Sequence, residues 1–313
     1  MNRFIPHSVQ LNTAGGVAAW INEILETTAD ENVSLFEEAS GSETDREFVA
    51  AKDIAPTMPI STLDLSFLGT CGMLGIPIAP PGSGVEGLLA YGRELPLGAL
   101  PTALATAHHL TCKVTDGLLV PVNASASHNQ SARLALMLHA ILGSAGTSGA
   151  APMIFTASQA INSGAGATVN LYTTGVVHFN SRLVTGIMHI AVDFGIGVFK
   201  ESTSGNVYPD FISIISRMPK IKFSTRDSEL ISEVGDGIAV TSFAAYFRQI
   251  NQNGQRVAVA TPTHISISGV AGMITPGAWS LKHKSPGESA FTITPSLNSS
   301  LLTISTTATI PTS

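Results

Sequence analysis

Short runs that alternate apolar and polar residues make up most of the chain, and they predict β-strands. Residues 187–199 alternate and are rich in β-branched and aromatic side chains, and residues 220–225 alternate as a half-buried strand does. Similar runs recur in both halves, at 88–91, 110–114, 117–122, 134–138, 211–216, 242–247, 257–259, 264–268 and 290–294. Short strands at turn-like intervals favour a sandwich or an open barrel.

A long block of the sequence is written twice. Phe48 and Phe211 are 163 residues apart (211 − 48), and the same separation relates Asp30 to Asp193, Phe36 to Phe199 and the Ser-Thr-x-Asp motifs at 61–64 and 224–227. After that motif the separation is 155 (246 − 91), and it relates Tyr91 to Tyr246, His109 to His264, Pro121 to Pro276 and His128 to His283. One eight-residue insertion (163 − 155) accounts for the change. A register kept this long predicts an internal duplication.

The duplication predicts an all-β chain with minor helix, folded as two tandem β-sandwich or open-barrel domains at 1–160 and 161–313. The spacing of residues 17–25 would suit a short helix, but their counterparts at 181–188 are typical of a turn and a strand, so we predict strand. Short helical turns are expected after Asp64 and Asp227. The Gly/Ala/Ser-rich segment at 143–166 connects the domains, and 153–155 is the expected last strand of the first.

Charged residues make up 12% of the chain, about half the usual 25%. Segments 134–181 and 257–281 contain none. This favours a subunit that covers much of its surface in an assembly, the alternative being a neutral, Ser/Thr/Asn-rich surface on a monomer. The net charge of −6 argues against a protein that grips nucleic-acid phosphates. No secretion signal or 18-residue apolar run is visible, so we expect no membrane insertion.

The motifs that could carry chemistry have simpler structural interpretations. Gly82, Gly84 and Gly87 match a G-x-G-x-x-G pattern, but Pro80-Pro81 precedes them in place of a strand, which predicts a loop and not a nucleotide site. The repeated histidines lack further ligands at metal-binding spacing, and we expect structural roles. Cys71 and Cys112 are expected to be buried small apolar residues. We therefore expect no cofactor, no metal and no enzyme activity.

Repeated charged residues are candidates for structural or inter-subunit contacts: Arg93, Arg248, Asp64, Asp227, Glu38 and Glu201. The acids stand beside turn residues, where carboxylates cap main-chain amides. The two arginines are expected to pair with these carboxylates, within or between subunits. The insertion at 69–87 is either a loop that reaches a neighbour or a tolerated extra loop; its candidate contact residues are Ile76, Pro77, Pro80, Pro81 and Gly84.

The duplicated blocks at 41–64 and 205–227, with Val192-Asp-Phe-Gly195 before the second, resemble the tail tube proteins of long-tailed bacteriophages that carry two tube domains in one chain. The resemblance implies a protein of the virion tail that forms homotrimeric, pseudo-hexameric rings stacked into a tube. During assembly it would be located in the host cytoplasm. Its partners would be itself, other virion tail proteins, and genomic DNA that passes through the channel without specific binding. The loop at 69–87 would correspond to the family's stacking loop.

Other functions remain open at this stage. A baseplate hub or another ring-forming virion protein would share the same features. A monomeric tandem binding module, such as a glycan binder, would need a cluster of exposed aromatic residues, and the chain has only two Trp and four Tyr.

Overall fold

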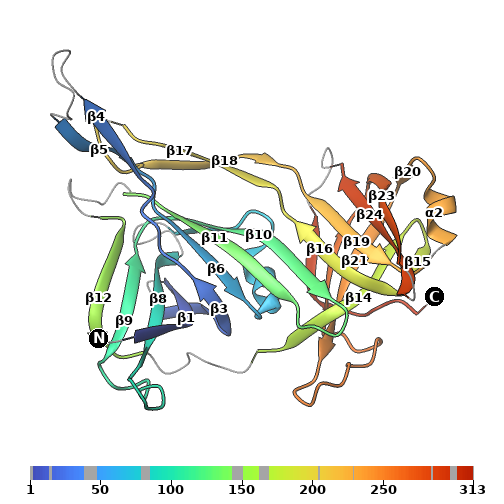
Figure 1. Cartoon of the computed structure of the whole chain (residues 1–313), viewed down its shortest axis with the longest axis horizontal. Coiled ribbons are helices and arrows are strands. Elements are labelled where there is room, and N and C mark those ends of the chain that lie inside the picture. The colour runs from blue at the N-terminus through green and yellow to red at the C-terminus, as the bar shows by residue number, and fades with distance from the viewer. Residues whose placement is uncertain are drawn as a thin grey trace.

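The computed structural model describes residues 3–13, 16–38, 48–78, 85–142, 151–161, 169–203, 205–227, 229–282, 285–296 and 302–312. Strands dominate it, and its described helical elements are short (Figure 1). They are the 3-10 turn η1 (Leu65–Phe67), α1 (Leu68–Cys71) and α2 (Glu229–Val234). The predicted all-β fold with minor helix is confirmed.

One large antiparallel sheet runs through the whole molecule. Its main path has the order β20 (Ile238–Val240), β23 (Gly272–Lys282), β24 (Ser285–Pro295), β19 (Lys220–Thr225), β16 (Ile187–Asp193), β10 (Gly117–Ser127), β11 (Arg133–Ala140), β6 (Thr57–Thr62) and β3 (Ile24–Thr27). A tenth strand, β7 (Ile76–Ile78), pairs with the first residues of β10.

Two five-stranded sheets form a second layer, one in each half of the chain. The first has the order β12 (Met153–Gln159), β9 (His109–Val114), β8 (Val85–Leu95), β1 (Arg3–Thr13) and β2 (Gly16–Ile21). The second has the order β15 (Arg182–Val184), β14 (Leu171–Phe179), β21 (Phe243–Ile250), β22 (His264–Gly269) and β25 (Thr303–Ala308). Apolar side chains of both layers pack into a continuous core, as alternating strands require.

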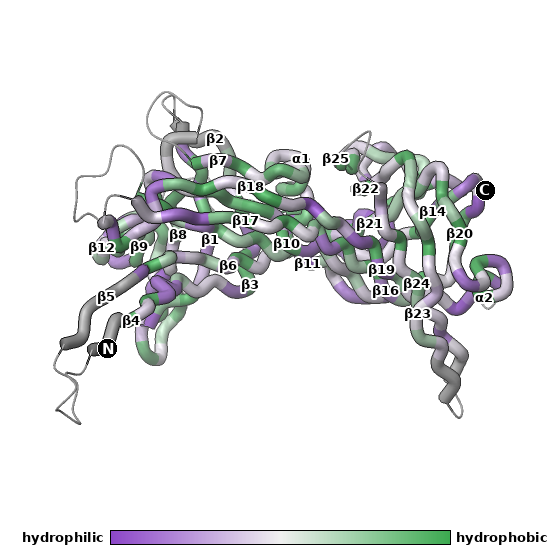
Figure 2. The backbone as a smooth tube through the Cα atoms, turned by 90° about the horizontal axis from the view of Figure 1, so that it is seen from above, coloured by the Kyte–Doolittle hydropathy of each residue, from purple (hydrophilic) through white to green (hydrophobic). Residues whose placement is uncertain are grey.

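Two hairpins belong to neither layer, and in Figure 2 one of them projects from the body while the other lies over the strands of the first half. The hairpin of β4 (Val33–Glu38) and β5 (Phe48–Ile54) leaves the first half at one end of the molecule. The hairpin of β17 (Ile196–Glu201) and β18 (Phe211–Arg217) runs from the second half back across the first. We call these the first arm and the second arm.

The two halves have the same strand order. Strands β3, β6, β11 and β10 lie side by side in the first half, and β16, β19, β24 and β23 follow the same order in the second. The pairings agree residue by residue: Thr27 lies opposite Ile60 and Ile190 opposite Phe223, each 163 positions on (190 − 27, 223 − 60). We use "counterpart" for residues related in this way. A common origin of the halves, and a domain boundary at 160, stay predictions.

The backbone repeats its unusual conformations as well. Asn32 and Gly195 both have positive φ, at 48° and 57°. A Cβ on Gly195 would lie 2.1 Å from the Met218 carbonyl oxygen, which excludes a side chain there. The N–H of Asn32 binds Asp30 Oδ1 at 2.9 Å, and the N–H of Gly195 binds Asp193 Oδ1 at 3.0 Å. These two aspartates stabilise turns, as the sequence predicts for repeated acids beside turn residues.

Residues 17–25 form parts of β2 and β3, so the strand prediction is confirmed against the helical spacing. Residues 257–259, expected as a strand, lie in a loop, because the N–H of Val257 binds Gln249 O and its carbonyl accepts from the Arg248 side chain. Among the described residues, no helix has the length and apolar character needed to cross a membrane.

Candidate functional site

The strands β10 and β16 join the two halves into one sheet. Ala124 lies opposite Val192, Ala126 opposite Ile190, and all four side chains are buried in the core. Ser127 lies opposite His189, and its hydroxyl oxygen is 3.1 Å from His189 Nδ1. Main-chain bonds from Phe194 N–H to Val122 O (3.0 Å) and from His128 N–H to Met188 O (2.7 Å) extend the contact at both ends. We call this contact the internal junction.

The turn between β10 and β11 covers the first residues of β14 at the internal junction. The N–H of Ala132 binds Tyr172 O at 2.6 Å, and Thr173 Oγ1 lies 3.4 Å from Ser127 O. Tyr172 is 2% exposed, and this burial, with a smaller contribution from Asp64, raises the pKa of its hydroxyl to about 12. Arg256 adds a side-chain bond of 3.0 Å to Asn129 in the same turn.

The second arm adds further contacts between the two halves, through residues outside β10 and β16. The N–H of Ile54 donates to Val207 O at 2.9 Å, and the N–H of Leu142 donates to Pro209 O at 2.8 Å. The Lys200 ammonium lies 3.4 Å from the Ala55 carbonyl oxygen. The loop at the end of the second arm is therefore fixed to the first half by main-chain hydrogen bonds.

Each side of the internal junction has a counterpart at a free edge of the large sheet. β3 is the counterpart of β16 and ends the sheet on one side. β23 is the counterpart of β10; among the described residues, β20 pairs only with its first residues, Gly272 to Ile274. Residues 278–282 of β23 therefore present an unpaired edge in the described part of the chain, as does β3.

Apolar side chains near the two free edges, including those of β1 beside β3, are more exposed than the residues at the corresponding places of the internal junction. Phe4 and Ile5 in β1 are 37% and 38% exposed, whereas Tyr172 and Thr173, at the corresponding places of β14, are buried. Trp279 in β23 is 62% exposed, whereas its counterpart Ala124 is buried. Exposed apolar side chains therefore lie near both free edges of the large sheet: Trp279 on β23, and Phe4 and Ile5 in β1 beside β3.

An apolar cavity of about 200 Å³ lies between the two layers of the first half, beside the free β3 edge. Its lining includes Phe4, Ala29, Tyr91, Gly92, Leu110 and Cys112. In the second half Phe247 stands at the place of Gly92, Val192 at that of Ala29 and Ile267 at that of Cys112, all fully buried. Sequence reasoning missed this cavity and Trp279, although the aligned halves carried the signal as pairs of small and large residues.

The repeated arginines bind main-chain carbonyl groups. Arg93 Nε donates to Thr102 O at 2.8 Å, and Arg248 Nε donates to Val257 O at 2.8 Å, which is the counterpart contact (257 − 102 = 155). Burial, and then the neighbouring Arg256, lower the pKa of Arg248. Both arginines thus hold a loop of their own half. Their expected pairing with carboxylates of another subunit stays a prediction.

Of the repeated histidines, His109 and His264 have matching contacts, and His283, the counterpart of His128, lies outside the described residues. His109 Nδ1 accepts from the Glu94 N–H, and His264 Nδ1 accepts from the Gln249 N–H, both at 3.1 Å. Their Nε2 atoms lie 3.0 Å from Ala103 O and 2.9 Å from Ala258 O. Both rings are fully buried, so each bridges two main-chain groups, which is the structural role that the sequence predicts.

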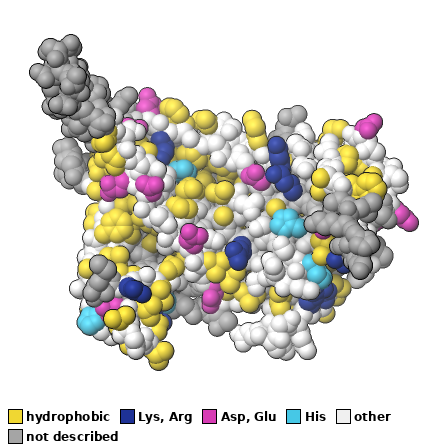
Figure 3. All heavy atoms as spheres, viewed as in Figure 1, with side chains coloured by type: hydrophobic (Ala, Val, Ile, Leu, Met, Phe, Trp, Pro, Cys, Tyr) yellow, Lys and Arg dark blue, Asp and Glu magenta, His cyan; other side chains and the backbone are white. Residues whose placement is uncertain are grey.

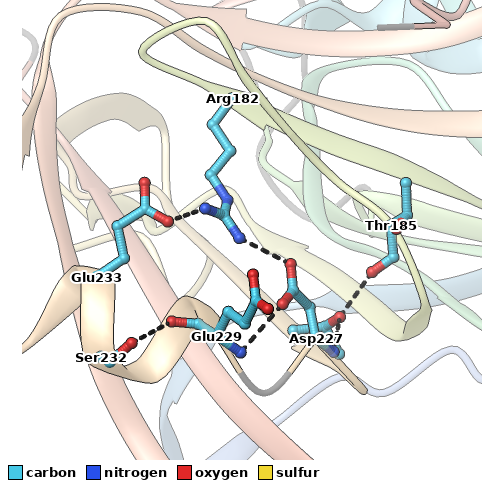
Figure 4. A network of polar contacts seen from close by, with 7 residues as sticks. Arg182, Thr185, Asp227, Glu229, Ser232 and Glu233 are labelled. Carbon is cyan, nitrogen blue, oxygen red and sulfur yellow. Dashed lines mark hydrogen bonds and ion pairs between the residues drawn. The ribbon is translucent and has the colours of Figure 1, made fainter.

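Asp227 lies at the start of α2 in a polar network (Figure 4). Its carboxylate accepts from the Glu229 N–H at 3.2 Å and pairs with Arg182 at 2.9 Å, while Arg182 also binds Glu233. Its counterpart Asp64 is buried and accepts from the Ser66 hydroxyl, and burial raises the pKa of Asp64. The first half lacks this ion pair because Ala19 stands at the place of Arg182.

The remaining candidates lie in different surroundings. Glu38 and Glu201 end the outward strands of the two arms, and Glu201 is exposed. Ile76 and Pro77 belong to β7, which pairs with β10 as β20 pairs with β23, so these two do not lie in a free loop. Pro80, Pro81 and Gly84 lie outside the described residues. Cys71 and Cys112 are free and buried, as expected, and burial raises the pKa of each to about 12.

The surface offers little charge for binding acidic or basic ligands. Figure 3 shows charged side chains scattered over one face among apolar and uncharged ones. In the described part of the chain, no group of three or more His, Cys, Asp or Glu residues could hold a metal ion. No family model matches the sequence, and no curated protein matches it at a significant level.

Proposed function

We propose that this protein is a structural subunit that joins copies of itself edge to edge in a closed ring, as a bacteriophage tail tube protein does. The observation that carries the proposal is the internal junction, because the counterparts of its two strands lie at opposite free edges of the same sheet. The β23 edge of one copy can therefore pair with the β3 edge of the next in the same geometry.

The exposure of the edges supports this pairing. Ala124 and Val192, which are buried at the internal junction, have exposed counterparts at the free edges, Trp279 and Ala29. An unpaired apolar edge strand invites association with other chains, and closure into a ring removes all such edges.

The arms support the same arrangement. The second arm lies over the first half of its own chain, whereas the first arm projects away from the body (Figure 1). In a ring the first arm would lie over the second half of the neighbouring copy, near Met218, the counterpart of Ala55. Met218 and Ile215 are 70% and 66% exposed there. Both arms would then have equivalent contacts.

The number of copies and the role of the channel come from the resemblance to tail tube proteins. Three chains would supply six similar units around the channel of a virion tail. A protein with net charge −6 and few Lys or Arg would let DNA pass without holding it, because like charges repel and few counterions would be released.

Negative-stain electron microscopy and size-exclusion chromatography with light scattering, on the full chain at rising concentration, test the proposal. We expect a change from the 32.5 kDa monomer to closed rings with threefold or pseudo-sixfold end views. Rings that stack into tubes support a tube subunit, and rings that never stack favour a baseplate hub or another virion ring. A chain that stays monomeric at all concentrations contradicts the proposal and favours a tandem binding module.

A further inference from the structure

Trp279 occupies a position that is filled by a small buried residue at the internal junction. Trp279 lies opposite Ser289 within its own half, and Ala124 lies opposite Leu134, at the corresponding place 155 residues earlier (279 − 124, 289 − 134). Ala124 points into the core between the two layers. The same strand position therefore directs the indole of Trp279 to the inner face of the sheet, beyond the end of its own half.

The residue that would face Trp279 across a ring contact is Ala29. At the internal junction Ala124 lies opposite Val192, and the counterparts of these two residues are Trp279 and Ala29 (192 − 163). Inside the chain, the small side chain of Ala124 faces the larger Val192. Between chains, the large side chain of Trp279 would face the small Ala29.

Space for the indole exists beside Ala29. The apolar cavity of about 200 Å³ is lined by Ala29 together with Phe4, Tyr91, Gly92 and Cys112. A dry apolar cavity of about 150 Å³ is large enough to bind benzene. The corresponding space of the second half is occupied by the buried ring of Phe247, the counterpart of Gly92.

We propose that Trp279 of one copy inserts into this cavity of the next copy and is the main side-chain anchor of the ring contact. This inference rests on the proposed ring formation and specifies its partner surface. Buried tryptophans in fitted pockets are typical anchors of protein interfaces. No side chain of the described residues fills the cavity, and the indole is exposed, so each lacks a partner in the described part of the chain.

The glycine at position 92 gives a direct way to close the cavity. A Cβ added to Gly92 would be 3.4 Å from Phe4 Cβ and 3.7 Å from Leu110 Cβ, which is ordinary contact. Gly92→Phe copies the second half, where Phe247 fills this space, so we expect the variant to fold and to block insertion. Gly92→Ala is the matched control, because it adds only the Cβ atom.

The experiment measures the dissociation constant of the ring contact by analytical ultracentrifugation of the full chain. We expect Trp279→Ala and Gly92→Phe each to weaken association by about 30-fold or more, since an anchor residue contributes at least about 2 kcal/mol. Gly92→Ala should change it less than about threefold. In the Trp279→Ala background, Gly92→Phe should cause little further loss, because both changes remove the same contact.

Fluorescence distinguishes failure of this inference from failure of ring formation. Trp20→Phe leaves Trp279 as the sole tryptophan and retains an aromatic ring beside Tyr91, whose centroid is 6.0 Å from that of Trp20. On assembly, emission should shift to shorter wavelength and acrylamide quenching should fall several-fold. Rings in which Trp279 stays accessible, or which form equally well with Trp279→Ala, overturn the inference and leave the proposed function standing. A wild-type chain that never associates overturns both.

Discussion

Ala124 of β10 lies directly opposite Val192 of β16, and both side chains are fully buried at the junction of the two halves. This pair predicts that an exchange between Ala and Trp affects the stability of the monomer strongly at position 124 and weakly at position 279. Ala124→Trp forces a large ring into a filled core and should lower the free energy of unfolding by about 1–3 kcal/mol or more. Trp279→Ala should change the stability of the monomer by at most about 0.5 kcal/mol, since the side chain is exposed. Urea unfolding at concentrations below assembly measures both, and equal losses would contradict the assignment of counterparts.

The buried histidines should be important for stability and not for metal binding. His109→Ala and His264→Ala each leave a main-chain N–H and a carbonyl without their ring partner, at about 1–3 kcal/mol for each group that stays dry. His108→Ala, at an exposed neighbour whose Nδ1 lies 3.3 Å from the Glu94 carboxylate, is the control and should cost at most about 1 kcal/mol. Thermal unfolding with Zn²⁺ or with a chelator should give the same midpoint. A rise in the midpoint with Zn²⁺ would reveal a metal site.

The network around Asp227 should stabilise the second half through α2. Asp227→Ala removes the acceptor for the Glu229 N–H and the partner of Arg182, and we expect a loss of about 1–2 kcal/mol. Arg182→Ala removes only the partly exposed ion pairs and should cost at most about 1 kcal/mol. Chemical unfolding of the two variants compares them. If Arg182→Ala were the more harmful change, the ion pair and not the helix start would be the main contribution.

His139 predicts a dependence of stability on pH. Burial, and then the nearby Lys200, lower the pKa of His139 to about 4. An unfolded histidine titrates near pH 6.5, so between about pH 6.5 and 4 the unfolded chain binds a proton that the folded chain does not. Stability should therefore fall as the pH falls through this window.

Two variants test the contribution of His139. His139→Gln should flatten the curve of melting temperature against pH between 4 and 6.5, with its slope above pH 7 unchanged. Lys200→Met should narrow the steep part of the curve from its low-pH end, because removing the positive charge raises the pKa of His139 toward its ordinary value. An unchanged curve in both variants would mean that other groups cause the acid sensitivity.

The local elements of this fold follow from the sequence because the two halves check each other. The helical spacing at 17–25 was ambiguous by itself, and the strand-like counterpart at 181–188 resolved it correctly. The constant separations of 163 and 155 residues also predicted where corresponding strands begin. The strand predicted at 257–259 is wrong, because an apolar triplet resembles a strand in sequence, whereas the Arg248 side chain binds the Val257 carbonyl and holds this segment in a loop.

The candidate site was less accessible to sequence reasoning. The pairing of β10 with β16 joins strands about sixty residues apart, and no local pattern specifies such a contact. Arg93 and Arg248 bind carbonyl groups of loops in their own half, a contact that their spacing in the sequence did not indicate. Trp279 could have been singled out from the sequence, since the alignment of the two halves places this large residue at the position of the small Ala124.

The internal junction also determines how an assembly of this chain would come apart. One polypeptide supplies both strands of that junction, so the main chain keeps them at a high effective concentration that dilution cannot lower. Contacts between β23 and β3 have no such tether. Around a ring, internal junctions within one chain would alternate with contacts between chains. Dilution or heating would open only the contacts between chains and release whole chains. A ring in which every unit is a separate chain would have twice as many contacts that dilution can open.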